Sequence, residues 1–161
     1  MKRKFIKKLI VLCVSIMMVL GLNAQSLVSA HWSLEKSITL IEPGQELELT
    51  FKVNLDDTWY IYATDQDPDL GPIPTSVTLE GQGFKLIGNP KPIKAKTKYD
   101  EVWEGDTRVI TESGGGFIQR IKVLEPNPKI KATINYTVCS METGQCVFGE
   151  QEFIIKLNQS K

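Results

Sequence analysis

Cys139 and Cys146 are the residues whose type and spacing are best suited to covalent chemistry. Six residues, SMETGQ, separate them. A cysteine thiolate attacks a disulfide sulfur to form a mixed disulfide, and a second nearby cysteine resolves it, so such a pair can carry out thiol–disulfide exchange. The separating segment contains Gly144, which favours a hairpin loop. We therefore expect the two side chains to meet where two strands are joined.

The spacing of the pair also bears on what a disulfide there would contribute. Closing so short a loop stabilises a fold by roughly 2.5 kcal/mol, against about 4.7 kcal/mol for a loop of a hundred residues. A disulfide selected for stability alone would tie distant strands together. The spacing therefore favours a local, accessible and reducible disulfide, and leaves a passive hairpin staple as the alternative.

The N-terminus has the features of an export signal. The uncharged, mostly apolar run from Leu9 to Leu22 would span about 21 Å as a helix, short of the roughly 30 Å hydrocarbon core of a membrane. We predict a signal peptide over residues 1–24, with an alternative cleavage site after Ala30. Its removal takes away Cys13, and the two remaining cysteines of an exported chain are expected to form a disulfide. The apolar run follows a basic stretch made of Lys2, Arg3, Lys4, Lys7 and Lys8.

Charge and composition exclude several classes of function. The whole chain has 19 basic and 19 acidic residues, and the signal contains five of the basic ones, which leaves the mature chain at −5. That sign argues against nucleic acid or an anionic membrane surface as a partner. Two cysteines and His31 cannot complete a structural zinc site, and alternating acidic residues at 65–69 fit a calcium loop poorly. We expect no metal, no cofactor and no membrane span in the mature chain; the oligomeric state is not predicted.

Strand patterns run through the predicted mature chain, residues 25–161. Apolar and polar residues alternate at 47–53 and 130–138, which is typical of half-buried strands. Residues 58–63, TWYIYA, are aromatic and β-prone. The absence of a helical period, together with frequent turn residues, predicts a single all-β sandwich domain. Further short strands are expected at 75–79, 84–87, 108–111, 117–124 and 146–157, with loops at 64–74 and 88–100 and a hairpin joining 108–111 to 117–124.

Several segments resemble the N-terminal periplasmic domain of the DsbD family of thiol–disulfide interchange proteins. The resemblance covers roughly residues 32–157. The segments are TWYIYA (58–63), GPIPTSVTL (71–79), DEVWEGD (100–106) and, the most specific, YTVCSMETGQCVFGEQEFIIKL (136–157). The resemblance implies an immunoglobulin-like β-sandwich in the periplasm, with secretion as the alternative location.

The resemblance also assigns roles to individual residues. Cys146 would engage thioredoxin-like periplasmic proteins and Cys139 would resolve the mixed disulfide. A cap loop would cover the disulfide, with Val102 or Trp103 as the shielding side chain, and carboxylates in this loop would raise the thiol pKa of Cys146. Tyr60 and Tyr62 match aromatic residues near the pair. The cap segment consists of Asp100, Glu101, Val102 and Trp103.

The sequence also departs from the family. Val147-Phe148-Gly149 follows the second cysteine, where family members commonly have an aromatic residue or Leu and then prolines. The sequence contains neither the multi-helix membrane domain nor the thioredoxin-like domain of full-length members, so we expect a stand-alone copy that exchanges electrons with separate proteins. The rival interpretation is a non-catalytic β-sandwich that binds a protein or glycan and uses the disulfide as a staple.

Overall fold

The structure is a computed structural model, and it describes residues 29–36, 40–101 and 103–159. The predicted signal peptide and Val102 lie outside these residues. The described part consists of strands and one short 3-10 helix, and none of it forms a long apolar helix of the kind that crosses a membrane. The strands are β1 (Ala30–Lys36), β2 (Leu40–Ile41), β3 (Glu46–Leu55), β4 (Trp59–Tyr62), β5 (Ser76–Gln82), β6 (Phe84–Ile93), β7 (Lys96–Asp100), β8 (Gly105–Ile110), β9 (Gly115–Val123), β10 (Lys129–Ser140), β11 (Cys146–Ile155) and β12 (Asn158–Gln159), and the 3-10 helix η1 is Pro68–Leu70.

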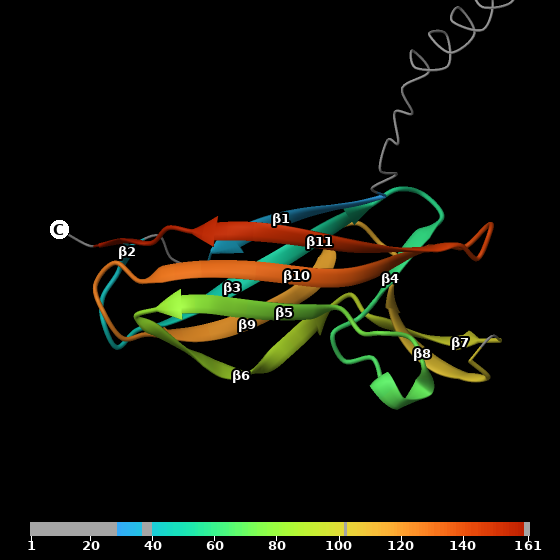
Figure 1. The fold of residues 1–161 in the computed structure, drawn as a ribbon, viewed down its shortest axis with the longest axis horizontal. Coiled ribbons are helices and arrows are strands. Elements are labelled where there is room, and N and C mark those ends of the chain that lie inside the picture. Colours follow the sequence, from blue (N-terminus) through green and yellow to red (C-terminus); the bar gives the residue numbers. More distant parts are fainter. Residues whose placement is uncertain (1–28, 37–39, 102, 160–161) are drawn as a thin grey trace, which may run out of the picture.

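Two antiparallel sheets pack face to face (Figure 1). The first has the order β1-β3-β9-β6, and the second has the order β11-β10-β4-β8-β7. The long strand β10 pairs with β11 along one side. On its other side it pairs with β5 over residues 129–135 and with β4 over residues 138–140. The all-β, immunoglobulin-like sandwich predicted from the sequence is confirmed.

The core lies between the sheets and follows the predicted alternation. In β3 every second residue, Leu47 to Val53, is buried. Phe51 stacks on Phe117 of β9 with ring centroids 5.0 Å apart, and both rings are fully buried. In β10 the alternation holds up to Ile134, but every residue from Tyr136 to Ser140 is buried. Both faces of β10 are therefore covered at its C-terminal end, which is the end that contains Cys139.

Two sequence-based expectations were wrong. Residues 88–100 form most of β6 and β7 rather than a loop. Pro90 and Pro92 made this segment look like a loop, because proline is rare inside sheets. However, β6 is an edge strand, where an outward-facing proline removes no ladder hydrogen bond, and its register shifts between Ile87 and Lys91. The strands predicted as a hairpin across Gly114 are β8 and β9, and they belong to different sheets, so the glycine segment connects the two layers.

Candidate functional site

Cys139 and Cys146 form a disulfide across two neighbouring strands, which confirms the predicted pairing. Cys139 is near the end of β10, Cys146 begins β11, and the two are directly opposite in the ladder. Their Cα atoms are 4.0 Å apart and their sulfur atoms 2.09 Å apart. The register of the hairpin therefore already brings the two sulfur atoms together.

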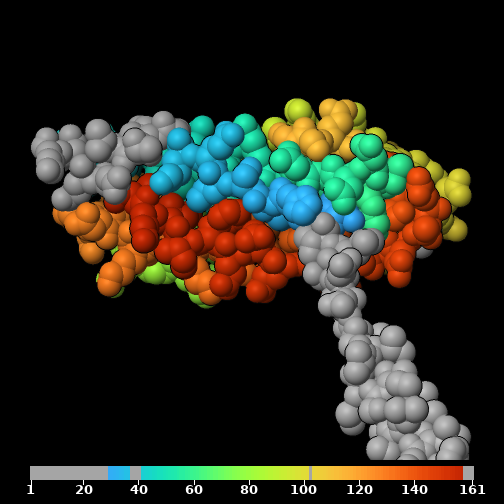
Figure 2. All heavy atoms as spheres, turned by 90° about the horizontal axis from the view of Figure 1, so that it is seen from above, coloured from blue at the N-terminus to red at the C-terminus, as the bar shows by residue number. Residues whose placement is uncertain are grey.

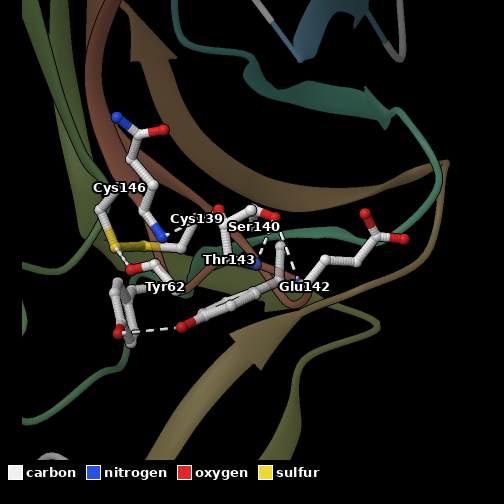
Figure 3. The surroundings of a disulfide bond; sticks show 9 residues. Tyr62, Cys139, Ser140, Glu142, Thr143 and Cys146 are labelled. Carbon is white, nitrogen blue, oxygen red and sulfur yellow. Dashed lines mark hydrogen bonds between the residues drawn. A yellow bond between two sulfur atoms is a disulfide. The ribbon is translucent and has the colours of Figure 1, made fainter.

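The six-residue loop between the cysteines is held by its own hydrogen bonds. The Ser140 hydroxyl accepts from the backbone N–H groups of Glu142 and Thr143, each at 3.2 Å (Figure 3). The N–H of Ser140 donates to Gln145 O at 2.9 Å, and that of Gly144 donates to Ser140 O at 3.0 Å. Gly144 has φ +68°, a left-handed conformation that favours glycine. These bonds fix the turn independently of the disulfide.

The disulfide lies on the outer face of its sheet. In antiparallel sheets directly opposite residues point to the same face, and Tyr60, Cys139 and Cys146 are opposite one another across β4, β10 and β11. Tyr60, Cys139, Tyr62 and Val109 form a buried cluster separate from the main core. The two aromatic residues predicted near the pair are thus placed as follows: Tyr60 lies opposite Cys139 on the neighbouring strand, and Tyr62 lies in the same buried cluster.

The two cysteines differ sharply in exposure. Cys139 is fully buried, with 0% of its surface accessible. Cys146 is exposed, as are Val147 and Phe148 after it. An attacking thiolate must reach a sulfur atom, so Cys146 is the member of the pair that another molecule can approach.

The two tyrosines form a polar contact beneath the disulfide. Their rings are edge to face with centroids 5.5 Å apart, and the hydroxyl oxygens are 3.4 Å apart (Figure 3). Burial raises the pKa of Tyr62 far above its usual value, and the hydrogen bond to Tyr60 and the negative charge of Asp100 act in the same direction; a hydrogen bond with Trp103 opposes them. Lys98 Nζ lies 4.7 Å from the centre of the Tyr60 ring, a cation–π contact.

The raised pKa of Tyr62 predicts a pH dependence of stability. Neutral Tyr62 is favoured in the folded state, so its contribution is complete below the unfolded pKa of about 10 and is lost as the pH rises through the folded pKa. We expect the free energy of unfolding to fall above about pH 10, and Tyr62→Phe to remove part of that slope. Urea unfolding at a series of alkaline pH values measures it, and identical slopes for the two proteins would contradict it.

The described residues of the predicted cap segment lie at the end of β7 and in the connection to β8. Asp100 ends β7, and its Oδ1 accepts from the backbone N–H of Trp103 at 3.4 Å. Trp103 packs on Gly71, where an added Cβ would meet its ring at 2.1 Å, and Gly71 also has φ +124°. On the other side of the turn Leu70 packs against Gly105, where an added Cβ would lie 2.5 Å from its Cδ1. The turn is thus fastened to the segment around η1.

Trp103 is 42% exposed. A core tryptophan would be buried, so Trp103 is a surface residue of the connection between β7 and β8.

One cavity is lined by most of the predicted site residues, but not by the buried Cys139. It has a volume of about 520 Å³ and is lined by Cys146, both tyrosines, and Asp100, Glu101 and Trp103 of the cap segment. Lys98, Tyr99 and Met141 also line it and were not predicted. Had residues 96–100 been recognised as a strand, the period of two would have placed Lys98 on the same face as Asp100.

A second depression, of about 570 Å³, lies at the opposite end of β10. Alkyl side chains and lysines line it, among them Ile130, Ile154, Lys129 and Lys131. Its lining contains no cysteine, so the cavity at the disulfide is the better candidate for thiol chemistry.

The acidic segment at residues 65–69 is engaged in protein contacts. Asp65 accepts two hydrogen bonds from Arg108, and Asp67 accepts from the N–H of Asp69 at the start of η1. Within the described residues no three His, Cys, Asp or Glu side chains are grouped as a metal site would require. These carboxylates therefore have local structural roles.

No family model matches the chain, and no curated protein matches it. Among solved structures, the chain is similar to the N-terminal domain of DsbD from Neisseria meningitidis in the reduced form. The identity is 18% and the TM-score is 0.48, with 84% of this chain and 94% of that chain covered.

Proposed function

We propose that the protein exchanges disulfides with other proteins through the Cys139–Cys146 pair. The observation that carries the proposal is the asymmetry of the pair: a buried Cys139 is bonded to an exposed Cys146 at the rim of a cavity. In support, three of the segments that carry the sequence resemblance to DsbD N-terminal domains, those around Tyr60, Asp100 and Cys146, converge on that cavity.

The exchange conserves atoms and electrons in two steps. With the pair reduced, the Cys146 thiolate attacks a partner disulfide, forms a mixed disulfide and releases one partner cysteine as a thiolate. Cys139 then loses its proton and attacks Cys146 Sγ, which releases the second partner cysteine and closes the Cys139–Cys146 bond. The partner gains two electrons and the pair loses two; the reverse sequence reduces the pair.

The segment from Asp100 to Trp103 acts as a lid in this proposal. Three of its residues, Asp100, Glu101 and Trp103, line the cavity together with Cys146. The Trp103 ring packs against Gly71 and is partly exposed. A partner can therefore displace it without disrupting the core. Thioredoxin-like proteins of the periplasm are the partners that we propose, because their chemistry is the same two-cysteine exchange.

The reduction potential of the pair tests the proposal. Structural disulfides of exported proteins typically lie below about −300 mV, whereas exchange-competent pairs lie higher. We expect equilibration with glutathione buffers, followed by mass spectrometry of the two redox forms, to give a potential above about −300 mV. A potential well below that value would favour the passive staple instead.

A further inference from the structure

The release of Cys139 is the step of the proposed exchange that the surroundings of the disulfide oppose most. When a partner thiolate attacks Cys146 Sγ, the bond between the two sulfur atoms breaks and its electron pair leaves on Cys139 Sγ. Cys139 has no accessible surface and packs in a buried cluster with Tyr60, Tyr62 and Val109. Burial disfavours a thiolate. A positive charge close to this cluster would offset that effect.

Lys98 brings a positive charge to the cluster. Its Nζ atom lies 4.7 Å from the centre of the Tyr60 ring, and Tyr60 is opposite Cys139 on the neighbouring strand. Lys98 also lines the cavity with Cys146, and no other lysine, arginine or histidine is among the described residues that line it. In Figure 2, yellow atoms of the segment that contains β7 lie beside the orange-red atoms of the cysteine hairpin at one end of the molecule.

The strand pairing explains how the lysine side chain reaches the ring. Directly opposite residues of an antiparallel ladder point to the same face. Lys98 is opposite Thr107, and Val109, two residues further along β8, is opposite Tyr62. The Thr107 hydroxyl donates to Lys98 O at 2.9 Å, which fixes the backbone of β7 at this point. Because β8 lies between β7 and β4, Lys98 extends across β8 on the same outer face as the disulfide.

Charges of the opposite sign also lie near the pair. Asp100 and Glu101 line the cavity, and Glu142 is in the loop between the cysteines. Negative charges disfavour a thiolate, as burial does. Lys98 is therefore the group that can counter both effects on Cys139. The other titratable residues that line the cavity, besides Cys146, are tyrosines, which are neutral at pH 7, namely Tyr60, Tyr62 and Tyr99.

We propose that the ammonium group of Lys98 stabilises the Cys139 thiolate, across the Tyr60 ring, whenever the disulfide opens or closes. The inference rests on the proposed function and adds a residue for its reaction. When the pair is reduced, the charge favours the departure of Cys139, because a thiol of lower pKa leaves faster. When the pair is oxidised, the same charge helps Cys139 to lose its proton before it attacks Cys146 Sγ. Lys98 acts through its charge and forms no bond to sulfur.

The rate at which dithiothreitol reduces the oxidised pair tests the inference. Lys98→Met removes the charge and keeps a side chain of similar length. We expect it to slow the reduction roughly threefold at pH 7, whereas Lys98→Arg should react like the parent protein. Acid quenching followed by mass spectrometry counts the thiols.

Lys96→Met is the matched control. Lys96 is exposed on the same face of β7, but it forms an ion pair with Glu112 and does not line the cavity. This variant loses the same charge from the same strand, so it should be reduced at the parent rate. Equal urea midpoints for the variants show that they are folded alike.

The pH profile of Cys139 alkylation shows whether the thiolate itself is affected. In the Cys146→Ala variant, neutral iodoacetamide reacts with Cys139, and peptide mapping by mass spectrometry assigns the label. We expect the addition of Lys98→Met to move the profile to higher pH by about half a unit, which lowers the rate about threefold below the midpoint. A change in the exposure of Cys139 alone would instead alter the rate at every pH.

Three outcomes would overturn the role of Lys98. They are equal reduction rates and coincident pH profiles with and without the charge, an equal slowing by Lys96→Met, and a failure of arginine to restore the rate. If Lys98→Met does not fold, Lys98→Gln gives the same comparison with a polar side chain. A folded parent protein whose disulfide dithiothreitol does not reduce would overturn the proposed function instead.

Discussion

Replacing Cys139 by Ala is expected to leave Cys146 readily alkylated, whereas Cys139 in the Cys146→Ala variant should react roughly a hundredfold more slowly with iodoacetamide. Cys139 has no accessible surface and is packed with Tyr60, Tyr62 and Val109, while Cys146 is exposed at the sheet edge. Burial disfavours the charged thiolate, and thiolate is the species that reacts. Both effects slow Cys139.

Peptide mapping by mass spectrometry over time measures this difference and assigns each label to its own cysteine. The control is alkylation in denaturant, where the two thiols should react at similar rates. Similar rates in the folded variants, or a faster Cys139, would contradict the division of roles in which Cys146 meets the partner and Cys139 resolves the mixed disulfide.

Replacing Trp103 by Ala is expected to speed the reaction of reduced Cys146 with a small disulfide by up to about tenfold, while costing about 1 kcal/mol of stability or less. The indole lines the cavity and rests on Gly71. Because the side chain is partly exposed, we expect its truncation to lower the free energy of unfolding by much less than the about 3–5 kcal/mol that a buried Trp would cost. The acceleration would arise because the cavity opens toward Cys146.

Stopped-flow measurements with glutathione disulfide and urea unfolding give the two quantities. Trp103→Phe is the control, because it keeps an apolar ring over Gly71 and should react nearly as slowly as the parent protein. An unchanged rate combined with a large loss of stability would show that Trp103 is a structural residue and not part of a lid.

The strands with regular alternation could be predicted from the sequence. The alternation at 130–138 identified the central strand, and the short separation of Cys139 from Cys146 identified the hairpin. Both signals are local, since they depend on the period of the strand and on the turn residue Gly144. For the same reason the pairing of the two cysteines was predictable.

Contacts between distant segments could not be predicted in the same way. The partners of β8 and β9 are chosen by packing of the whole sandwich, and the short glycine segment between them resembles a hairpin turn as much as a connection between layers. The prolines and lysines of β6 and β7 are typical of loops, but they are equally compatible with edge strands.

In the candidate site, too, individual residues could be predicted from the sequence, whereas contacts between distant segments could not. Cys146 was identified from residue type and spacing, and Tyr60 and Asp100 were identified through sequence resemblance. The cavity includes all three. The packing of Trp103 on Gly71 joins residues of two separate loops and has no local signal. Lys98 and Tyr99 were missed because their strand was taken for a loop.

Electron transfer between this protein and a thioredoxin-like protein tests the central claim most directly. The reduced protein is mixed with one equivalent of an oxidised periplasmic thioredoxin-like protein, the reaction is quenched with acid, and the thiols and disulfides are mapped by mass spectrometry. We expect the Cys139–Cys146 disulfide to form as the partner disulfide is reduced, with a transient mixed disulfide through Cys146. A pair that stays reduced beside an unchanged partner disulfide, in a folded protein whose Cys146 is alkylated readily, would contradict the claim.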